Sequence, residues 1–322
     1  MTAPAATGRR TTPAAWVAAH PWVWSFGAAV VAWVAISVIA GQGLLGTLSG
    51  TLGLVPFLVL TGVGQLMVIT LGNGHIDLSL PNVVTLAAYV STGIMNGGTG
   101  STLLGFAVPF AVGLVVAAVN VGLVLGLRVP PIVATLAVGL VLQSAVLVYT
   151  TGFQASVDPG LVAFTRARVL GLSVLGLLCV LVAVAVGFVL FRTSYGRAVQ
   201  AVGQNVRAAR LAGIPVGRVV AACYAMSALL AALTGVLLGA FSTPNLDLGQ
   251  PYLLNSIAIV VLGGSLISGG RSTVTGVWGG ALFFVLLLTL LDVLGVGVAL
   301  QNVVKGLLII LVLVLVGADR RE

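Results

Sequence analysis

The sequence predicts an all-α, polytopic membrane protein with about ten transmembrane helices. Hydrophobic residues make up 59% of its 322 residues, and only 6% of the residues are charged, whereas a soluble domain carries roughly 25% charged residues. So few charges cannot cover a surface that faces water, and most of the surface is expected to face lipid. Within lipid every backbone polar group needs an internal partner, which restricts the fold to helices or a closed barrel. The apolar runs are continuous and long, which favours helices over the short alternating strands of a barrel.

Ten apolar runs define the predicted membrane spans. They cover residues 22–41, 51–71, 78–96, 102–127, 130–150, 169–191, 219–241, 252–268, 273–292 and 300–316. Glycines and Pro56 interrupt the second run, and the eighth runs into a glycine-rich stretch. The chain therefore divides into an N-terminal tail (1–21), a transmembrane domain (22–316) and a C-terminal tail (317–322). The first run is expected to stay in the protein as an uncleaved span.

The distribution of arginines indicates how the spans are oriented. With the N-terminus in the cytoplasm, eleven arginines fall in cytoplasmic segments and only Arg166 and Arg168 fall in external loops. The eleven are Arg9, Arg10, Arg128, Arg192, Arg197, Arg207, Arg210, Arg218, Arg271, Arg320 and Arg321. Cytoplasmic loops carry an excess of Lys and Arg. We therefore expect an even number of spans in the plasma (inner) membrane with both termini in the cytoplasm, and we attribute the net charge of +8 to topology and not to nucleic-acid binding.

The one sizeable cytoplasmic connection covers residues 192–218. Apolar residues recur there at three- and four-residue spacing, which predicts a short amphipathic helix over 199–214 that ends near Gly213, before Pro215. Such a helix can lie on the lipid surface, or it can dock onto a cytoplasmic partner. Small residues at its centre favour docking. The predicted contact residues are Gly203, Asn205, Arg207, Ala208, Ala209 and Gly213.

Several kinds of catalytic site are missing from the sequence. The two histidines, His20 and His75, are far apart, and both cysteines fall in apolar runs, so neither a metal cluster nor a disulfide framework is indicated. The chain has no G-x-S-x-G motif, no dinucleotide-binding fingerprint and no G-x-x-x-x-G-K-[ST] loop for a phosphate. We expect a protein that is no enzyme and holds no cofactor. If ATP drives it, another polypeptide binds the ATP.

Two glycine-rich breaks interrupt the apolar pattern. LGNGHIDLSLPNVVTL follows the second span, and VLGGSLISGGRSTVTGVWGG follows the eighth. Non-helical backbone at membrane depth survives only where it is buried in protein or lines an aqueous path, so broken helices in both halves of a chain indicate the translocation pathway. Whether the two breaks reflect an internal duplication stays open. The predicted pathway residues or structural caps are Asp77, Ser79, Asn82, Gly263 and Gly264.

Two charged residues lie where a charge is costly. Asp77, in the first break, is expected to cap the following helix, with Ser79 or Asn82 as rivals for that role; direct contact with a solute is the alternative. Lys305 stands inside the last span. Its side chain can reach outward to the membrane surface, pair with Asp292 or line the pore.

Four ordered motifs resemble one family of proteins. MVITLGNGHIDLSLPNVVTLAAY, RVPPIVATLAVGLVLQSAVLVYTTG, YGRAVQAVGQNVRAARLAGIPV and AIVVLGGSLISGGRSTVTGVWGGAL are similar to segments of the ribose-, xylose- and arabinose-type permeases of ABC importers, in the branched-chain amino acid and sugar permease superfamily. The likeness runs from about residue 50 to 316. It differs at the first break, where His75 replaces a usual glycine and Pro81-Asn82 a Gly-Ser pair, and at Arg271-Ser272. These differences leave the solute undetermined.

The resemblance implies a type II ABC importer-like permease for a simple sugar or a similar solute. It implies a second permease copy, identical or related, a cytoplasmic ATP-binding subunit that docks on residues 192–218, and an extracytoplasmic substrate-binding protein, all around a chain embedded in membrane lipid. An ABC permease for autoinducer-2 or a nucleoside is one alternative. An ion-coupled secondary transporter is another, although it would need ionisable groups within the membrane, for which only Asp77 and Lys305 are available.

Overall fold

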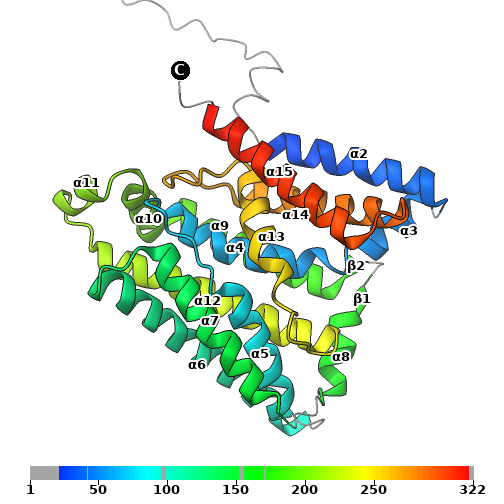
Figure 1. Cartoon of the computed structure of the whole chain (residues 1–322), viewed down its shortest axis with the longest axis horizontal. Coiled ribbons are helices and arrows are strands. Elements are labelled where there is room, and N and C mark those ends of the chain that lie inside the picture. The colour runs from blue at the N-terminus through cyan, green and yellow to red at the C-terminus, as the bar shows by residue number, and fades with distance from the viewer. Residues whose placement is uncertain (1–21, 42, 96–98, 152–155, 170–171, 319–322) are drawn as a thin grey trace, which may run out of the picture.

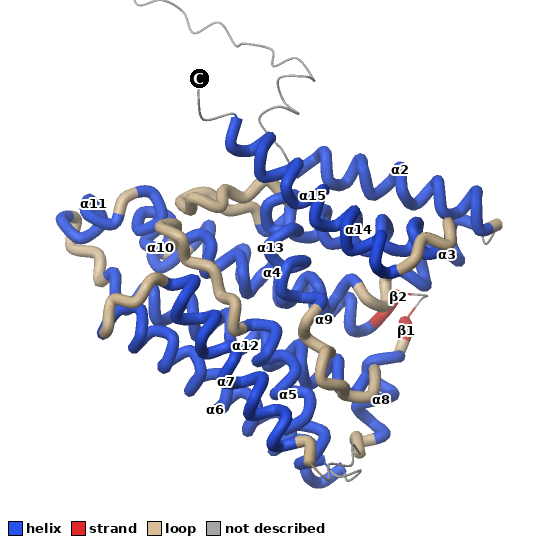
Figure 2. Tube along the Cα trace, in the orientation of Figure 1, coloured by secondary structure: helices blue, strands red, loops and turns tan. Residues whose placement is uncertain are grey.

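The computed structural model describes residues 22–41, 43–95, 99–151, 156–169 and 172–318, and helices dominate this part of the chain (Figures 1 and 2). The predicted all-α fold is therefore confirmed. The predicted N-terminal tail (1–21), with Arg9 and Arg10, lies outside the described residues, as do Arg320 and Arg321.

Ten apolar helices correspond one for one to the ten predicted spans. Six of the described helices are long and apolar enough to cross a membrane: α2 (Trp22–Ala40), α6 (Thr102–Val121) with the π-helix η2 (Gly122–Gly126), α7 (Pro131–Tyr149), α9 (Val174–Arg192), α12 (Val216–Phe241) and α14 (Val274–Val293). The shorter apolar helices are α4 (Val55–Thr70), α5 (Leu80–Met95), α13 (Pro251–Leu262) and the described start of α15 (Val298–Ala318). The prediction of about ten spans is confirmed at this level.

Short elements connect these helices. They are α3 (Gly43–Thr51), the 3-10 helix η1 (Thr99–Ser101), α8 (Pro159–Arg166), the antiparallel pair β1 (Arg168–Val169) and β2 (Leu172–Ser173), α10 (Ser194–Gln204) and α11 (Val206–Leu211). Asp158 caps α8 through its bond from the Gly160 N–H and also accepts a hydrogen bond from the Thr102 hydroxyl. The hydrogen bond from Thr102, and to a smaller extent the one from Gly160, lowers the pKa of Asp158 below its usual value.

Three predicted boundaries were wrong. The sixth span starts at Val174 and not at 169, because the β1–β2 hairpin precedes it and the Ser173 hydroxyl caps it through the Gly176 N–H. The eighth span ends at Leu262 and not at 268, since Gly264 has a φ of 81° that no helix can continue. The predicted single helix over 199–214 is two helices, α10 and α11. Asn205 separates them, and its side chain accepts from the N–H groups of the first turn of α11.

α4 lies at the centre of the protein, and every one of its residues is buried. Its glycines allow neighbouring helices to approach its backbone closely. A β-carbon on Gly62 would lie 2.3 Å from Ile259 Cδ1 of α13, and one on Gly64 would lie 3.3 Å from the Ser227 backbone of α12. α12, α13 and α14 pack on α4, and α5 packs on α12. α5 and α12 are also largely buried. This interior group holds both breaks in place.

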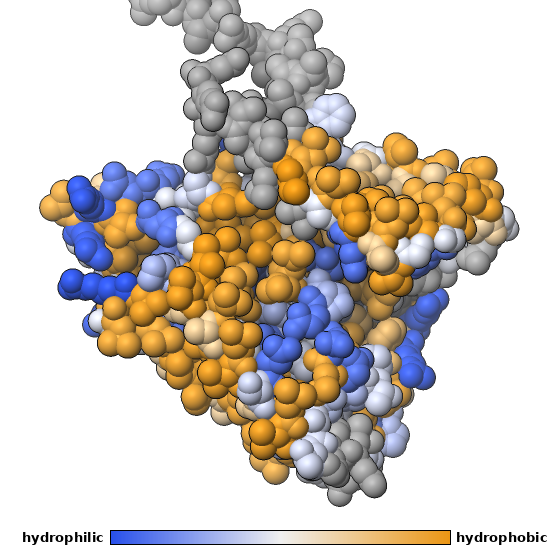
Figure 3. All heavy atoms as spheres, in the orientation of Figure 1, coloured by the Kyte–Doolittle hydropathy of each residue, from blue (hydrophilic) through white to orange (hydrophobic). Residues whose placement is uncertain are grey.

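The outer helices present apolar side chains to the exterior. Large hydrophobic residues of α2, α7 and α9 are widely exposed, among them Val31, Val141 and Leu181. Figure 3 shows hydrophobic side chains across the visible faces of α7, α15 and α2, while hydrophilic ones gather over α11. A surface of this kind is stable in a lipid bilayer and unfavourable in water.

The described arginines separate into two groups along the helices. One end of the molecule, here named the α11 end, carries α10, α11 and the loop before α14 (Figure 1). Its arginines are Arg128, Arg192, Arg197, Arg207, Arg210, Arg218 and Arg271. The opposite end, here the α8 end, carries Arg166 and Arg168 on α8 and β1. The two groups are the same as those that the sequence assigned to the cytoplasmic and the external side.

We predict that Gly276→Ala destabilises the protein and Gly27→Ala does not. At the crossing of α13 and α14, a β-carbon on Gly276 would lie 1.8 Å from the Gly263 carbonyl oxygen, whereas one on Gly27 in α2 meets no atom within 4 Å. Forced overpacking costs about 1–3 kcal/mol, while alanine in an open helix gains up to about 1 kcal/mol over glycine. Thermal unfolding of the purified variants in detergent measures the difference, and equal midpoints would contradict this crossing.

Candidate functional site

The first break, here residues 71–79, is an extended segment that turns back into the protein. It leaves the end of α4 beside α10 and runs to the start of α5, as the long loop in Figure 2 shows. With its amide oriented to suit its neighbours, the side chain of Gln65 in α4 both donates to the carbonyl of Asp77 and accepts from its N–H, each at 3.2 Å. The hydroxyl of Thr135 in α7 accepts from the Leu78 N–H (3.1 Å) and donates to the Ile76 carbonyl (3.0 Å). Buried side chains therefore replace the hydrogen bonds that a helix would supply.

The Asp77 carboxylate is buried within a group of polar side chains. Its Oδ1 accepts from the Ser79 hydroxyl (2.6 Å) and the Ser79 N–H (3.1 Å), and its Oδ2 accepts from the hydroxyl of Ser227 in α12 (2.8 Å). Asn120 of α6 donates to the Ser79 hydroxyl at 2.9 Å. Asp77 thus binds α12 to the start of α5. This fits the predicted structural role, but Asp77 stands two residues before the N-cap position, Ser79, whose carbonyl accepts the first helical bond.

The other predicted residues of the first break have different surroundings. Ser79 stands at the N-cap position, and its hydroxyl donates to Asp77 and accepts from Asn120. The Nδ2 atom of Asn82 lies 2.9 Å from where a β-carbon of Gly139 in α7 would stand, so Asn82 faces that helix. His75 pairs its Nδ1 with the hydroxyl of Tyr224 in α12 at 3.1 Å. Asp77 and Ser79 are therefore brought together, and Asn82 packs on α7.

The second break, here residues 263–273, forms a loop at the α11 end. Gly263 packs against Gly276 of α14, and Gly264, Gly269 and Gly270 have positive φ angles. The N–H of Gly270 donates to the carbonyl of Thr70 at the end of α4, at 2.9 Å. A β-carbon on Gly269 would also lie 2.3 Å from the Gly72 backbone, so the two breaks meet backbone to backbone. Their meeting point lies at Thr70 and Gly270, while the predicted Gly263 lies at the crossing with α14.

The coupling segment, here residues 194–214 with α10 and α11, contacts both breaks. A β-carbon on Gly203, near the end of α10, would lie 2.0 Å from the Thr70 carbonyl oxygen and 2.4 Å from the Gly270 nitrogen. A β-carbon on Gly72 would lie 2.5 Å from the Ser268 carbonyl oxygen and 2.8 Å from that of Gly203. Three segments far apart in sequence thus meet at a point where no side chain separates them.

The predicted contact residues of the coupling segment fall into two groups. Gly203 packs on both breaks, and Ala209 is buried with 3% of its surface exposed. Their small size serves packing within this chain. Asn205, Arg207, Ala208 and Gly213 are exposed, and Leu211 beside them is 90% exposed. The surface that a partner can reach consists of this second group.

Sequence reasoning placed residues 242–250 between two spans but did not reveal that this segment, between α12 and α13, packs into the protein. The N–H of Gly249 donates to the hydroxyl of Thr85 in α5 at 2.9 Å, and a β-carbon on Gly249 would lie 1.9 Å from the Pro81 carbonyl oxygen. The starts of α5 and α13 therefore lie side by side inside the protein. Two prolines, Pro244 and Pro251, with a glycine between them are the sequence signal that could have revealed it.

Comparison with known proteins decides what kind of protein this is. A family model described as "Branched-chain amino acid transport system / permease component" matches residues 47–313. The chain belongs to this family. The permease is 33% identical to the ribose import permease protein RbsC of Bacillus subtilis (strain 168) over 253 residues, which is 77% of each chain. No solved structure matches it.

Further relatives agree on the class of protein. The permease is 33% identical to the ribose import permease protein RbsC of Escherichia coli (strain K12), over 77% of this chain and 78% of the relative. It is 32% identical to the autoinducer 2 import system permease protein LsrC of Klebsiella pneumoniae subsp. pneumoniae, over 86% of this chain and 80% of the relative. The predicted class, a multi-pass transporter permease and not an enzyme, is confirmed by the family.

We predict that Asp77→Asn folds and that Asp77→Leu does not fold efficiently. Asparagine keeps an oxygen that can accept from Ser79, and its amide can donate to the Ser227 hydroxyl. Leucine leaves both hydroxyls and an amide unpaired in a buried site, at about 1–3 kcal/mol for each unsatisfied group. Yield of monodisperse protein in detergent measures folding. Normal yield of the leucine variant, or normal yield with lost transport in the asparagine variant, would refute a structural role.

Proposed function

We propose that this chain is the membrane-spanning permease subunit of an ABC importer for a monosaccharide or sugar-like solute. The observation that carries the proposal is the family membership of a chain whose surface-exposed coupling segment touches both helix breaks. Ribose is the first candidate solute because two relatives are named for its import. Autoinducer 2 is the second, after the name of another relative. A separate subunit hydrolyses ATP, and an extracytoplasmic binding protein delivers the solute.

Contacts of the coupling segment suggest how ATP binding moves the permease. An ATPase subunit that docks on α11 displaces α10 with it, because only Asn205 separates the two helices. Gly203 of α10 presses on the ends of both breaks without an intervening side chain. A shift of α10 is therefore passed to the start of α5 through the first break and to α14 through the second. In the proposed cycle, this shift switches access from one side of the membrane to the other.

The contacts of the charged residues favour ATP coupling over ion coupling. Asp77 is enclosed by donors from its own chain. Lys305 donates to Asn302 at 3.0 Å and Asp292 accepts from Gln301 at 2.6 Å, so the open possibility of a Lys305–Asp292 pair is not realised. An ion-coupled transporter needs ionisable groups that face a solute path.

Reconstitution tests the proposed function. The permease, its ATPase subunit and its binding protein are placed in proteoliposomes, and uptake of labelled ribose is followed with and without ATP after ion gradients are collapsed. The expected result is uptake that requires ATP and persists without a gradient. Uptake that requires only an ion gradient would overturn the proposal, and ATP-driven uptake of autoinducer 2 but not ribose would replace the solute.

We predict that Ala208→Trp lowers association with the ATPase subunit, because Ala208 lies on the exposed part of the coupling segment and a large side chain prevents close approach. Leu103→Trp is the control, an exposed position at the α8 end. Co-purification in detergent measures association. The expected outcome is loss for Ala208→Trp alone at unchanged folded yield; undiminished co-purification would return the segment to a lipid-surface role.

We also predict that both termini are cytoplasmic. The arginine distribution, eleven against two, supports the orientation by the positive-inside rule. Reporter fusions at Thr2 and Glu322 should give the same cytoplasmic signal. A periplasmic signal from only one fusion would contradict an even number of spans, and periplasmic signals from both would reverse the orientation.

A further inference from the structure

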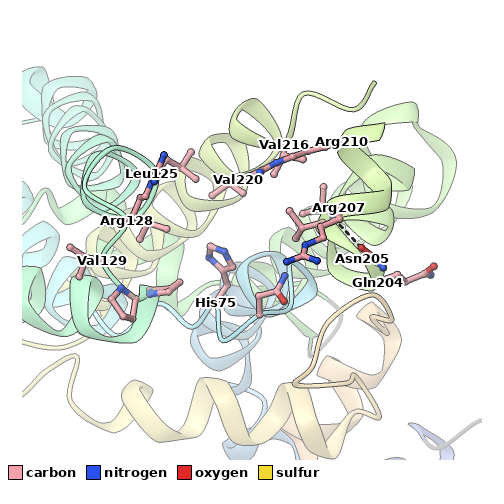
Figure 4. A pocket seen from close by; sticks show the side chains of 16 residues that line it. His75, Leu125, Arg128, Val129, Gln204, Asn205, Arg207, Arg210, Val216 and Val220 are labelled. Carbon is pink, nitrogen blue, oxygen red and sulfur yellow. Dashed lines mark hydrogen bonds between the residues drawn. The ribbon is translucent and has the colours of Figure 1, made fainter. Parts of the chain in front are cut away.

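An open cavity of about 710 Å³ lies at the α11 end, between the first break, the turn from α6 to α7 and the coupling segment. Figure 4 shows side chains from all three directed toward it, with Arg128 on one side, Arg207 on the other and His75 between them. The cavity borders the exposed surface of the coupling segment: Asn205 and Arg207 line it, whereas Ala208 and Leu211 do not.

The cavity is positively charged. Arg128, Arg207 and Arg210 line it, and none of the described carboxylates does. No ion pair involves these three arginines within the part of the chain that the structure describes. Three guanidinium groups around one space repel each other unless an anion lies among them, and planar guanidinium groups bind phosphate oxygens in pairs.

The backbone is strained at two points, and both line this cavity. Asn73 and Arg128 are the non-glycine residues with positive φ in the described chain, at 49° and 57°. Asparagine adopts this conformation fairly often, but for arginine it is unfavourable, and glycine would adopt it freely. An arginine at such a position indicates that its side chain is needed there.

A further irregularity lies directly before Arg128. The end of α6 widens into η2, a π-helix, and its Val124 and Leu125 line the cavity. π-helical turns are rare and occur frequently at functional sites. Without the strained turn and the wider helix, the direction of Arg128 would differ. The positive φ of Arg128 and the π-helix before it together set the direction of this side chain.

The surroundings of the cavity are apolar and face outward. Leu127 on the α6–α7 turn and Ile132 and Val133 in the first turn of α7 are exposed. Val124, Leu125 and Val129 form part of the wall. A ligand that fits both features has an anionic head and an apolar tail. Basic pockets between membrane helices at the cytoplasmic side bind the phosphate groups of lipids.

We propose that this cavity binds the phosphate-bearing headgroup of an anionic phospholipid, with Arg128 as a direct contact and the acyl chains against the α6–α7 turn. The same headgroup then contacts Arg207 and Arg210 of the coupling segment and lies beside Asn73 of the first break. Bound lipid would hold the coupling segment and the first break in the relative position seen here. The site does not require the ATPase subunit or a solute.

The test uses the full-length permease, purified alone in detergent and depleted of lipid. Its thermal unfolding midpoint is measured against rising phosphatidylglycerol, with phosphatidylcholine and inorganic phosphate as separate titrations. Arg128→Gln removes the contact. Arg197→Gln is the matched control, because Arg197 is an exposed arginine at the same end that does not line the cavity. Arg210→Gln is a second cavity variant, for use if Arg128→Gln folds poorly.

The expected result is a rise in midpoint with phosphatidylglycerol for the native chain and the Arg197 control, with little effect of phosphatidylcholine or phosphate. The cavity variant should need about fivefold more lipid, which corresponds to the ~1 kcal/mol that one basic side chain contributes near an anionic surface. Equal weakening in both variants would show general charge attraction, and an equal effect of inorganic phosphate would show a free-anion site. No lipid effect, with Arg128-dependent binding of the ATPase subunit, would assign the cavity to that partner. Each of these three results overturns the proposal.

Discussion

Lipid offers no hydrogen-bond partner, so the extended backbone around Asp77 has to find its partners within the protein. Gln65 and Thr135 supply them for the main chain, and the hydroxyls of Ser79 and Ser227 both donate to the Asp77 carboxylate. Four helices, α4, α5, α7 and α12, are fixed relative to each other by this requirement. The compact interior of the permease follows from this requirement, because each of these side chains must be buried to reach its hydrogen-bond partner.

Glycine allows the close backbone contacts at the α11 end. Helix breaks at the α11 end can meet only if their backbones come within van der Waals contact, and Gly72, Gly203 and Gly270 allow it. A methyl group at any of the three would occupy the place of a neighbouring main-chain or side-chain atom. The polar interior and the glycine contacts are joined by the first break itself, which starts at one and ends at the other.

The sequence predicted the class of fold, the ten apolar runs and the place of both breaks, because hydrophobicity and glycine content are local properties. It did not predict the direction in which small residues face. Ala209 and Gly203 were assigned to a partner surface, but they pack inside this chain, and spacing alone could not separate the two uses of a small residue. Asn205 was read as part of one helix, although its side chain suits the start of another. The pairing of Asp77 with Ser227 joins positions 150 residues apart, which no local pattern reveals.

Main-chain contact at Gly203 has an evolutionary consequence. The atoms through which α10 meets the two breaks are carbonyl oxygens, amide nitrogens and α-carbons, which every sequence shares. Substitutions that retune solute choice elsewhere in the membrane therefore leave this junction unaltered, provided that the glycines remain. Relatives named for different solutes, ribose and autoinducer 2, would keep such a junction wherever they keep its glycines, whatever side chains change elsewhere.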